Sequence, residues 1–168
     1  PQHKARWLER RNGSKIISER HWLVAKQNAE RRIPSFLGDI NLGVVAASLY
    51  WAEGAKHEGV GGMKFANTDP VLAKLYISLL RSAYQLDESR IRIYLHLHYY
   101  HRHREAIAFW SKLLGVPDSQ FGKIYVKKRS VLKRFRKNFQ GICFIHYFDG
   151  AVRRELLSLG QQIARKYA

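Results

Sequence analysis

Residues 90–98, RIRIYLHLH, constrain the fold more than any other stretch of the chain. Aliphatic residues occupy every second position and alternate with arginine, tyrosine and histidine. Because successive side chains of a β-strand point to opposite faces of a sheet, this period predicts a strand with one dry face and one wet, cationic face. The dry face is expected to carry Ile91, Ile93, Leu95 and Leu97.

Helices and further strands surround this segment. A first helix is expected from Asp39, as N-cap, to Gly54, as a left-handed C-cap glycine. A second begins at Asp69-Pro70, two more are expected at 104–115 and 152–168, and weaker strand patterns occupy 59–70, 122–129 and 141–148. Strands interleaved with helices, without strict alternation, indicate an α+β fold. The expected core of the second helix is Val71, Leu72, Leu75, Leu79 and Leu80.

The N-terminal residues differ from the rest in composition. Residues 4–34 are polar and basic, which predicts two short helices around Asn12-Gly13-Ser14 and a break at Ile33-Pro34-Ser35. We therefore expect a basic helical arm over 1–36 and a main domain over 37–168. The arm is either a packing or phosphate-contacting segment, which the loose spacing favours, or the remnant of a helix-turn-helix.

Charge and cysteine content limit the class of protein. Thirty Lys and Arg against thirteen Asp and Glu give a formal charge of +17, which indicates a polyanionic partner, with nucleic acid ahead of an anionic membrane surface. The single cysteine, Cys143, excludes an internal disulfide framework and indicates a reducing compartment, a cytoplasm or organelle interior. The longest apolar run, within 42–52, is too short to span a bilayer, so a soluble protein is expected.

Cations and aromatic residues of the wet sheet face are the candidate nucleic-acid contacts. A two-stranded ribbon fits the major groove, and contacts to phosphates are more frequent than contacts to base edges. The run over 127–137 is expected to hold the backbone, the alternative being a solvated charge run. The candidate contacts are Lys64, Arg90, Arg92, Tyr94, His96, Lys123, Lys127, Lys128, Arg129, Lys133 and Arg134.

Other residue clusters have two interpretations each. His96, His98, His101 and His103 have spacings that could bind zinc, but nearby arginines and the lack of a further ligand favour a polar patch. Four aromatic residues could stack on bases, but their helical spacing favours the core. These are Trp51, Tyr76, Phe109 and Trp110.

Glu53 lies at the end of the first helix, where the helix dipole disfavours an acid, so local stability does not explain it. Earlier in the same helix, Gly43 and Ala47 stand one turn apart. Their small side chains would admit another backbone at close range, or simply allow the helix to pack on its own sheet.

The segment AASLYWAEG, 46–54, resembles the LAGLIDADG motif of homing endonucleases and their DNA-binding relatives. Leu49, Ala52, Glu53 and Gly54 match the motif or change it conservatively, whereas Tyr50 and Trp51 depart from it. The order of elements over 37–168 is similar to the family's αββαββα unit, with the helix at 104–115 as an insertion. A group of single-motif prokaryotic proteins has segments similar to LYWAEGAK, FANTDP, FWSKLLGVP and QGICFIHY.

The resemblance implies a saddle-shaped antiparallel sheet lying in the major groove of double-stranded DNA. It also implies a homodimer in which two motif helices pack together, with Gly43 and Ala47 at the interface and Glu53 binding Mg²⁺ for phosphodiester cleavage. Lys56 could support the transition state or be a solvated loop residue. The alternatives are a non-catalytic DNA- or RNA-binding regulator and a splicing or ribosome-associated factor.

Overall fold

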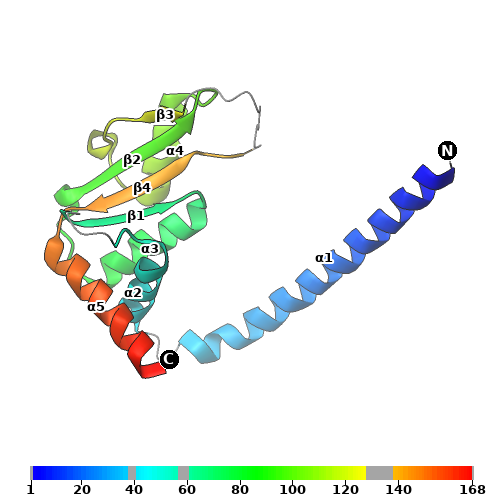
Figure 1. Cartoon of the computed structure of the whole chain (residues 1–168), viewed down its shortest axis with the longest axis horizontal. Coiled ribbons are helices and arrows are strands. Elements are labelled where there is room, and N and C mark those ends of the chain that lie inside the picture. Colours follow the sequence, from blue (N-terminus) through cyan, green and yellow to red (C-terminus); the bar gives the residue numbers. More distant parts are fainter. Residues whose placement is uncertain (1, 38–40, 57–60, 128–137, 168) are drawn as a thin grey trace. The chain divides into compact units, whose positions relative to one another are not determined.

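A computed structural model describes residues 2–37, 41–56, 61–127 and 138–167. The chain divides into two units, Pro1–Ile40 and Asn41–Ala168, where the sequence predicts a boundary after residue 36. The first unit consists of one helix, α1, and the second holds four further helices and a sheet (Figure 1). In the described part of the chain, no helix combines the length and the apolar character needed to cross a membrane.

The helix α1 (Gln2–Leu37) corrects the prediction of two short helices. It continues through Asn12-Gly13-Ser14 because one glycine costs a helix only about 1 kcal/mol relative to alanine, and helix-favouring Arg and Lys residues flank this site. The predicted break at Pro34 is also wrong. Pro34 lies in the last turn of α1, and the helix continues for three more residues to Leu37. Proline lacks an N–H, so it removes one backbone hydrogen bond, and it does so only in this final turn.

The second unit is α+β, as predicted, with a four-stranded mixed sheet in the order β1-β4-β2-β3. The strands are β1 (Met63–Asn67), β2 (Ile91–His98), β3 (Tyr125–Lys127) and β4 (Ile142–Tyr147). The helices are α2 (Leu42–Glu53), α3 (Pro70–Ala83), α4 (His103–Leu114) and α5 (Gly150–Tyr167). Short 3₁₀ turns cover Glu88–Arg90 and Asp118–Gln120.

The expectation of a wholly antiparallel sheet is wrong. Strand β4 pairs antiparallel with β1 and β2, but β2 pairs parallel with β3. Parallel neighbours need a crossover connection, and α4, the predicted inserted helix, supplies it between β2 and β3. Among the described elements, one strand, β1, lies between α2 and α3, where the αββαββα unit has two. An isolated bridge between Gly54 and Phe65 lies beside β1. The described elements therefore do not form a plain αββαββα series.

The dry side of the sheet forms one core with the helices. The predicted dry-face residues of β2 are all buried, as are Met63 and Phe65 of β1 and Cys143 and Ile145 of β4. Buried residues of all four helices belong to the same cluster. Figure 1 shows α4 behind β2 and β4. The described helices of this unit therefore pack on one face of the sheet.

The ends of α2 differ from the prediction. The N-cap is Asn41, whose side chain accepts from the Val44 N–H at 3.2 Å, whereas Asp39 lies outside the described residues. Gly54 has φ −80°, so it is not a left-handed cap. A glycine is needed there for space, because a Cβ would meet the ring and carbonyl of the fully buried Tyr50. The Tyr50 hydroxyl donates to the Ala55 carbonyl at 3.0 Å and holds the chain beneath the helix end.

The helix α3 begins as predicted, with Asp69 as N-cap and Pro70 in the first turn. The prediction of its buried side is confirmed in part: Leu79 and Leu80 are buried, and Leu72 packs partly buried against the core. Val71, 75% exposed, and Leu75 are exposed instead, and Ala73, Tyr76 and Ile77 are buried. The reason is an aromatic stack in the core, in which the Tyr76 ring lies 3.9 Å from that of Phe65. The full burial of Tyr76 confirms its assignment to the core from helical spacing.

Helices α4 and α5 are fixed by specific close contacts. The helix α4 ends at Gly115, as predicted, and this glycine has the left-handed conformation, φ 63°. Trp110 of α4 is fully buried, and its indole N–H donates to the Gln140 carbonyl at 2.9 Å. A Cβ on Gly160 of α5 would lie 3.0 Å from Trp51, so this glycine lets α5 approach α2. Trp51 remains 42% exposed, which contradicts its assignment to the core.

We expect Gly54→Ala to lower the free energy of unfolding by about 1–3 kcal/mol, the usual cost of overpacking, because the new methyl group meets the immobile Tyr50 ring. Urea denaturation at pH 7 measures the change. Gly61→Ala is the matched control, since nothing lies within 4 Å of its added Cβ. An unfolding midpoint for Gly54→Ala equal to that of Gly61→Ala would contradict this account.

Candidate nucleic-acid interface

The face of the sheet opposite the core is not covered by the described helices of the second unit, and it is termed the open face below. Its residues alternate along each strand with the buried ones and are half-buried or exposed. The open face consists of Lys64, Ala66, Arg92, Tyr94, His96, His98, Tyr125, Lys127, Ile142, Phe144 and His146.

The strand register arranges these residues in rows across the sheet. The first row joins Lys64, His146 and Arg92 on β1, β4 and β2. The second row joins Ala66, Phe144 and Tyr94, and the third joins Ile142, His96 and Tyr125. His98 pairs with Lys127 at the far end of β2. Cations therefore lie in the first and last rows, and the middle rows are aromatic or aliphatic.

Six rings lie in and beside these rows and are termed the aromatic cluster: Tyr94, His96, Tyr125, Phe144, His146 and Phe148. Ring contacts join three of them around His146 and three around His96, and the strand register places Phe144 of one group opposite Tyr94 of the other. The ring of His96 lies 4.2 Å from that of Phe144 and 4.8 Å from that of Tyr125. The ring of Tyr94 lies 4.6 Å from that of His146. These three pairs are tilted by 45–47°, so the rings do not cover one another as face-to-face stacks.

The two histidines of the cluster are neutral at physiological pH. Burial, followed by the nearby Lys64 ammonium, lowers the pKa of His146 to about 4. Burial also lowers the pKa of His96 below its usual 6.5. Both imidazoles therefore act as uncharged aromatic rings, and the charge on the open face comes from lysine and arginine.

A glycine creates the space for Tyr94 at the edge of the sheet. A Cβ on Gly122 would collide with the Tyr94 ring, and the Gly122 N–H donates to the Ile93 carbonyl at 2.8 Å. The segment before β3 therefore runs close beside β2, and the tyrosine ring lies over the glycine. This close approach keeps Tyr94 in the middle rows rather than displaced by a side chain from the edge.

Several predicted contacts lie on or near the open face, and others do not. Lys64, Arg92, Tyr94, His96 and Lys127 are brought together there. The Arg92 guanidinium also donates to the carbonyls of Ser89 and Ile91, both at 2.7 Å, so its position is fixed by the backbone. Lys123 is exposed but precedes β3. The predicted contacts at Lys128, Arg129, Lys133 and Arg134 lie outside the described residues.

Arg90 is a correction to the predicted set. It belongs to the 3₁₀ turn before β2 and not to the strand. Its guanidinium forms an ion pair with Asp149 at 2.8 Å, contacts the Phe148 carbonyl and lies 5.6 Å from the centre of the Tyr147 ring. Arg90 therefore connects the ends of β2 and β4 instead of extending the open face.

The sequence reasoning did not select Tyr125, Phe144 or His146 as site residues. The alternation in 141–148 indicated a strand, but both of its faces contain large apolar residues, so hydrophobicity alone did not say which face was open. The register of β4 against β2 decides it, because it places Phe144 opposite Tyr94.

The histidines do not gather into a metal site. Among the described residues, no group of three His, Cys, Asp or Glu side chains could hold a metal ion. His96 lies in the aromatic cluster, whereas His101 accepts from the His98 backbone N–H at 3.0 Å and lies 2.8 Å from the Phe139 carbonyl through Nε2. An Nε2–H tautomer satisfies both contacts of His101, so this ring holds the end of β2.

The end of α2 brings the predicted catalytic residues to the β1 edge of the sheet. Glu53 is exposed, and no ion pair joins it to another residue in the described ranges. The following Ala55 N–H donates to the Lys64 carbonyl at 2.9 Å, and the Arg153 side chain donates to the Lys56 carbonyl at 3.1 Å. Both contacts fix the backbone around Lys56, whose side chain is exposed.

Ala47, predicted at the dimer interface, is fully buried in its own domain, and a Cβ on half-buried Gly43 would meet Asn41 and Ala83. Neither residue lies on an exposed helix face. The exposed stripe of α2 instead holds Val44, Ser48 and Ala52, at positions i, i+4 and i+8.

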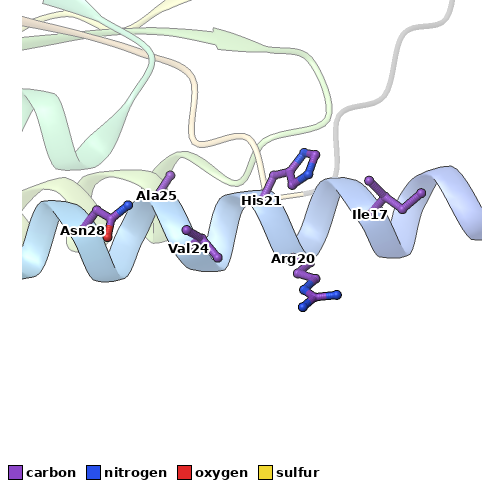
Figure 2. A pocket seen from close by; sticks show the side chains of 6 residues that line it. All are labelled: Ile17, Arg20, His21, Val24, Ala25 and Asn28. Atoms are coloured by element: carbon purple, nitrogen blue, oxygen red, sulfur yellow. The ribbon is translucent and has the colours of Figure 1, made fainter.

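A concave surface lies along α1 and is lined by residues of that helix. Figure 2 shows Ile17, His21 and Val24 on this stretch, with Arg20 pointing in another direction. Every described side chain over residues 14–31 is exposed. One helix cannot enclose a ligand by itself, so this concavity defines no binding site.

Comparisons with protein families, with curated proteins and with solved structures give no significant match to this chain.

We expect NMR titration to place the pKa of His146 near 4 and Lys64→Gln to raise it, though not to 6.5, because burial is the larger cause. Between pH 4 and 6.5, His146 binds fewer protons in the folded protein than in the unfolded chain. The contribution of this histidine to the free energy of unfolding is therefore fully present above pH 6.5 and is lost as the pH falls toward 4. In His146→Phe, the midpoint of urea unfolding should depend less on pH over this range. Equal pH dependence in the two proteins would refute the assignment.

Proposed function

We propose that this protein binds nucleic acid through the open face of its sheet. The observation that carries the proposal is a sheet face with lysine and arginine in its outer rows and aromatic rings between them, in a chain of net charge +17. Cations neutralise phosphates and release counterions, and rings contact bases. Every nucleic acid carries the negative charge that complements this surface, whereas only a strongly acidic protein would do so.

Replacing Lys64, Arg92 and Lys127 together by glutamine should weaken binding to any nucleic acid. It should also reduce the slope of log Kd against log salt by roughly 2 to 3, because each lost phosphate contact removes about 0.7–0.9. Fluorescence anisotropy with labelled oligonucleotides over 50–300 mM NaCl, roughly the range in which such slopes are measured, provides the test.

The matched control replaces Lys74, Arg104 and Lys112 by glutamine, which removes the same charge from exposed sites on α3 and α4. Its salt slope should equal that of the unaltered protein. If both triple variants lose binding equally, net charge rather than the open face determines affinity and the proposed interface is wrong. Binding that is insensitive to salt would remove the nucleic-acid function.

A second candidate function is metal-dependent cleavage of double-stranded DNA on a LAGLIDADG-type scaffold. The supporting observation is that Glu53 is exposed at the end of α2, beside the edge strand that carries Lys64. If α4 and β3 are left out, the order of elements is close to the family's αββαββα unit. The bridge at Gly54 and β1 stand for the first strand pair, β2 and β4 form the second, and the helices are α2, α3 and α5.

Among the described residues, no group of three acidic, histidine or cysteine side chains could hold a metal ion. A Mg²⁺ site on this candidate requires Glu53 from two chains, with nucleic-acid phosphates as further ligands. The ion would neutralise transition-state charge and activate water. A homodimer in which α2 helices pair through Val44, Ser48 and Ala52 would bring the two Glu53 residues together.

If the protein is a nuclease, Glu53→Gln should abolish Mg²⁺-dependent cleavage of a plasmid library while leaving DNA binding intact. Glu105→Gln, at an exposed site on α4, is the control and should cleave normally. Ser48→Arg should sediment as a monomer and lose cleavage, since it places a charge in the predicted helix pair. Cleavage by Glu53→Gln at the unaltered rate would eliminate this assignment.

A further inference from the structure

We propose that the open face binds unpaired bases of a single-stranded nucleic acid by stacking on its aromatic cluster. This inference rests on the proposed nucleic-acid function and names its substrate class. It does not depend on Glu53 or on a metal ion.

The side chains in the middle rows decide between paired and unpaired bases. Reading a duplex in its major groove requires hydrogen-bonding groups that reach base edges. Ala66, Phe144 and Ile142 have none, and the other middle-row residues, Tyr94, His96 and Tyr125, have one hydrogen-bonding group or imidazole each on a large aromatic ring. In a duplex the bases cover one another's faces, so the rings of the open face would find no partner there. An unpaired strand exposes those faces.

The rings are arranged to accept bases from outside. The tilted pairs leave part of each ring surface uncovered by its neighbour. At the two ends of the cluster, Tyr125 is 58% exposed and Phe148 is 43% exposed. Neutral His96 and His146 provide aromatic faces without the hydration of a charged imidazolium. Stacking on such surfaces tolerates any base, because every base has a π face.

The cations lie where a strand's phosphates would pass. Lys64 and Arg92 occupy the first row and Lys127 the last, on either side of the rings. A strand whose bases turn toward the aromatic cluster directs its phosphates away from it, toward these outer rows. Lysine is depleted at protein–protein interfaces, so the two lysines of the outer rows favour a polyanionic strand over a second protein chain.

Binding of the full chain to three fluorescein-labelled probes tests the proposal: sixteen-residue oligo(dT), sixteen-residue oligo(U) and a sixteen-base-pair mixed duplex, at one fixed salt concentration. We expect either single strand to bind at least tenfold more tightly than the duplex. The ratio between oligo(dT) and oligo(U) identifies DNA or RNA as the source of the strand. Equal or tighter duplex binding would overturn the inference and leave the proposed function standing.

Two variants assign the effect to the rings. Phe144→Ala and Tyr125→Ala should each weaken single-strand binding roughly tenfold or more, the usual effect of removing one stacking platform, and should leave duplex binding unchanged. Phe144→Trp and His96→Phe should retain the affinity. Phe109→Ala, at a half-exposed ring on α4, is the matched control and should bind normally. Tyr125 lies on an exposed edge strand, so its variant tests the inference even if Phe144→Ala unfolds.

The remaining outcomes are decisive as well. If no probe binds in a salt-dependent manner, the proposed function fails together with the inference. If Phe144→Ala changes the sedimentation of the protein and not its affinity for single strands, the open face is an interface between protein chains and the inference is wrong. If the ring variants weaken duplex and single-strand binding equally, the rings support the fold and do not stack on bases.

Discussion

The strict alternation of β2 is the constraint on which the second unit depends. Four aliphatic side chains on one face of this central strand require a core on that side only, and the pairing of β2 with β4 and β3 extends the division across the sheet. A shift of one residue in register would exchange the two faces and bury Arg92 in place of Ile91. The cost of burying an unpaired guanidinium excludes that register.

The position of α4 in the chain determines which side chains lie on the open face at β3. Because a helix intervenes between β2 and β3, the two strands run parallel, and Tyr125 comes to lie beside His96. A hairpin would instead have placed an antiparallel strand, with a different register, at this edge. The crossover thus adds Tyr125 to the aromatic cluster and Lys127 to its rim. Chain connectivity places them there, because the alternation of residues 122–129 by itself is only a weak strand pattern.

Two glycines permit close contacts at the edges of the sheet. Gly54 admits the Tyr50 ring beneath the end of α2, so the helix stops beside β1 with Glu53 exposed. Gly122 admits Tyr94 at the other edge of the sheet. In both places a tyrosine lies where a Cβ would stand. A side chain at either glycine would therefore displace the tyrosine ring beside it, in addition to restricting the local backbone.

The sequence by itself determined the fold class, the dry face of β2, the N-cap of α3, the end of α4 at Gly115, and the presence of cations on the wet face. Each depends on local periodicity, capping chemistry or composition, which are written in consecutive residues. Only the tertiary structure decided which side of β4 is open, that β3 is parallel, that Arg90 pairs with Asp149, and that Ala47 is buried and not on an exposed surface. These features depend on pairing between residues far apart in the chain. Local patterns are compatible with more than one such pairing, and packing selects among them.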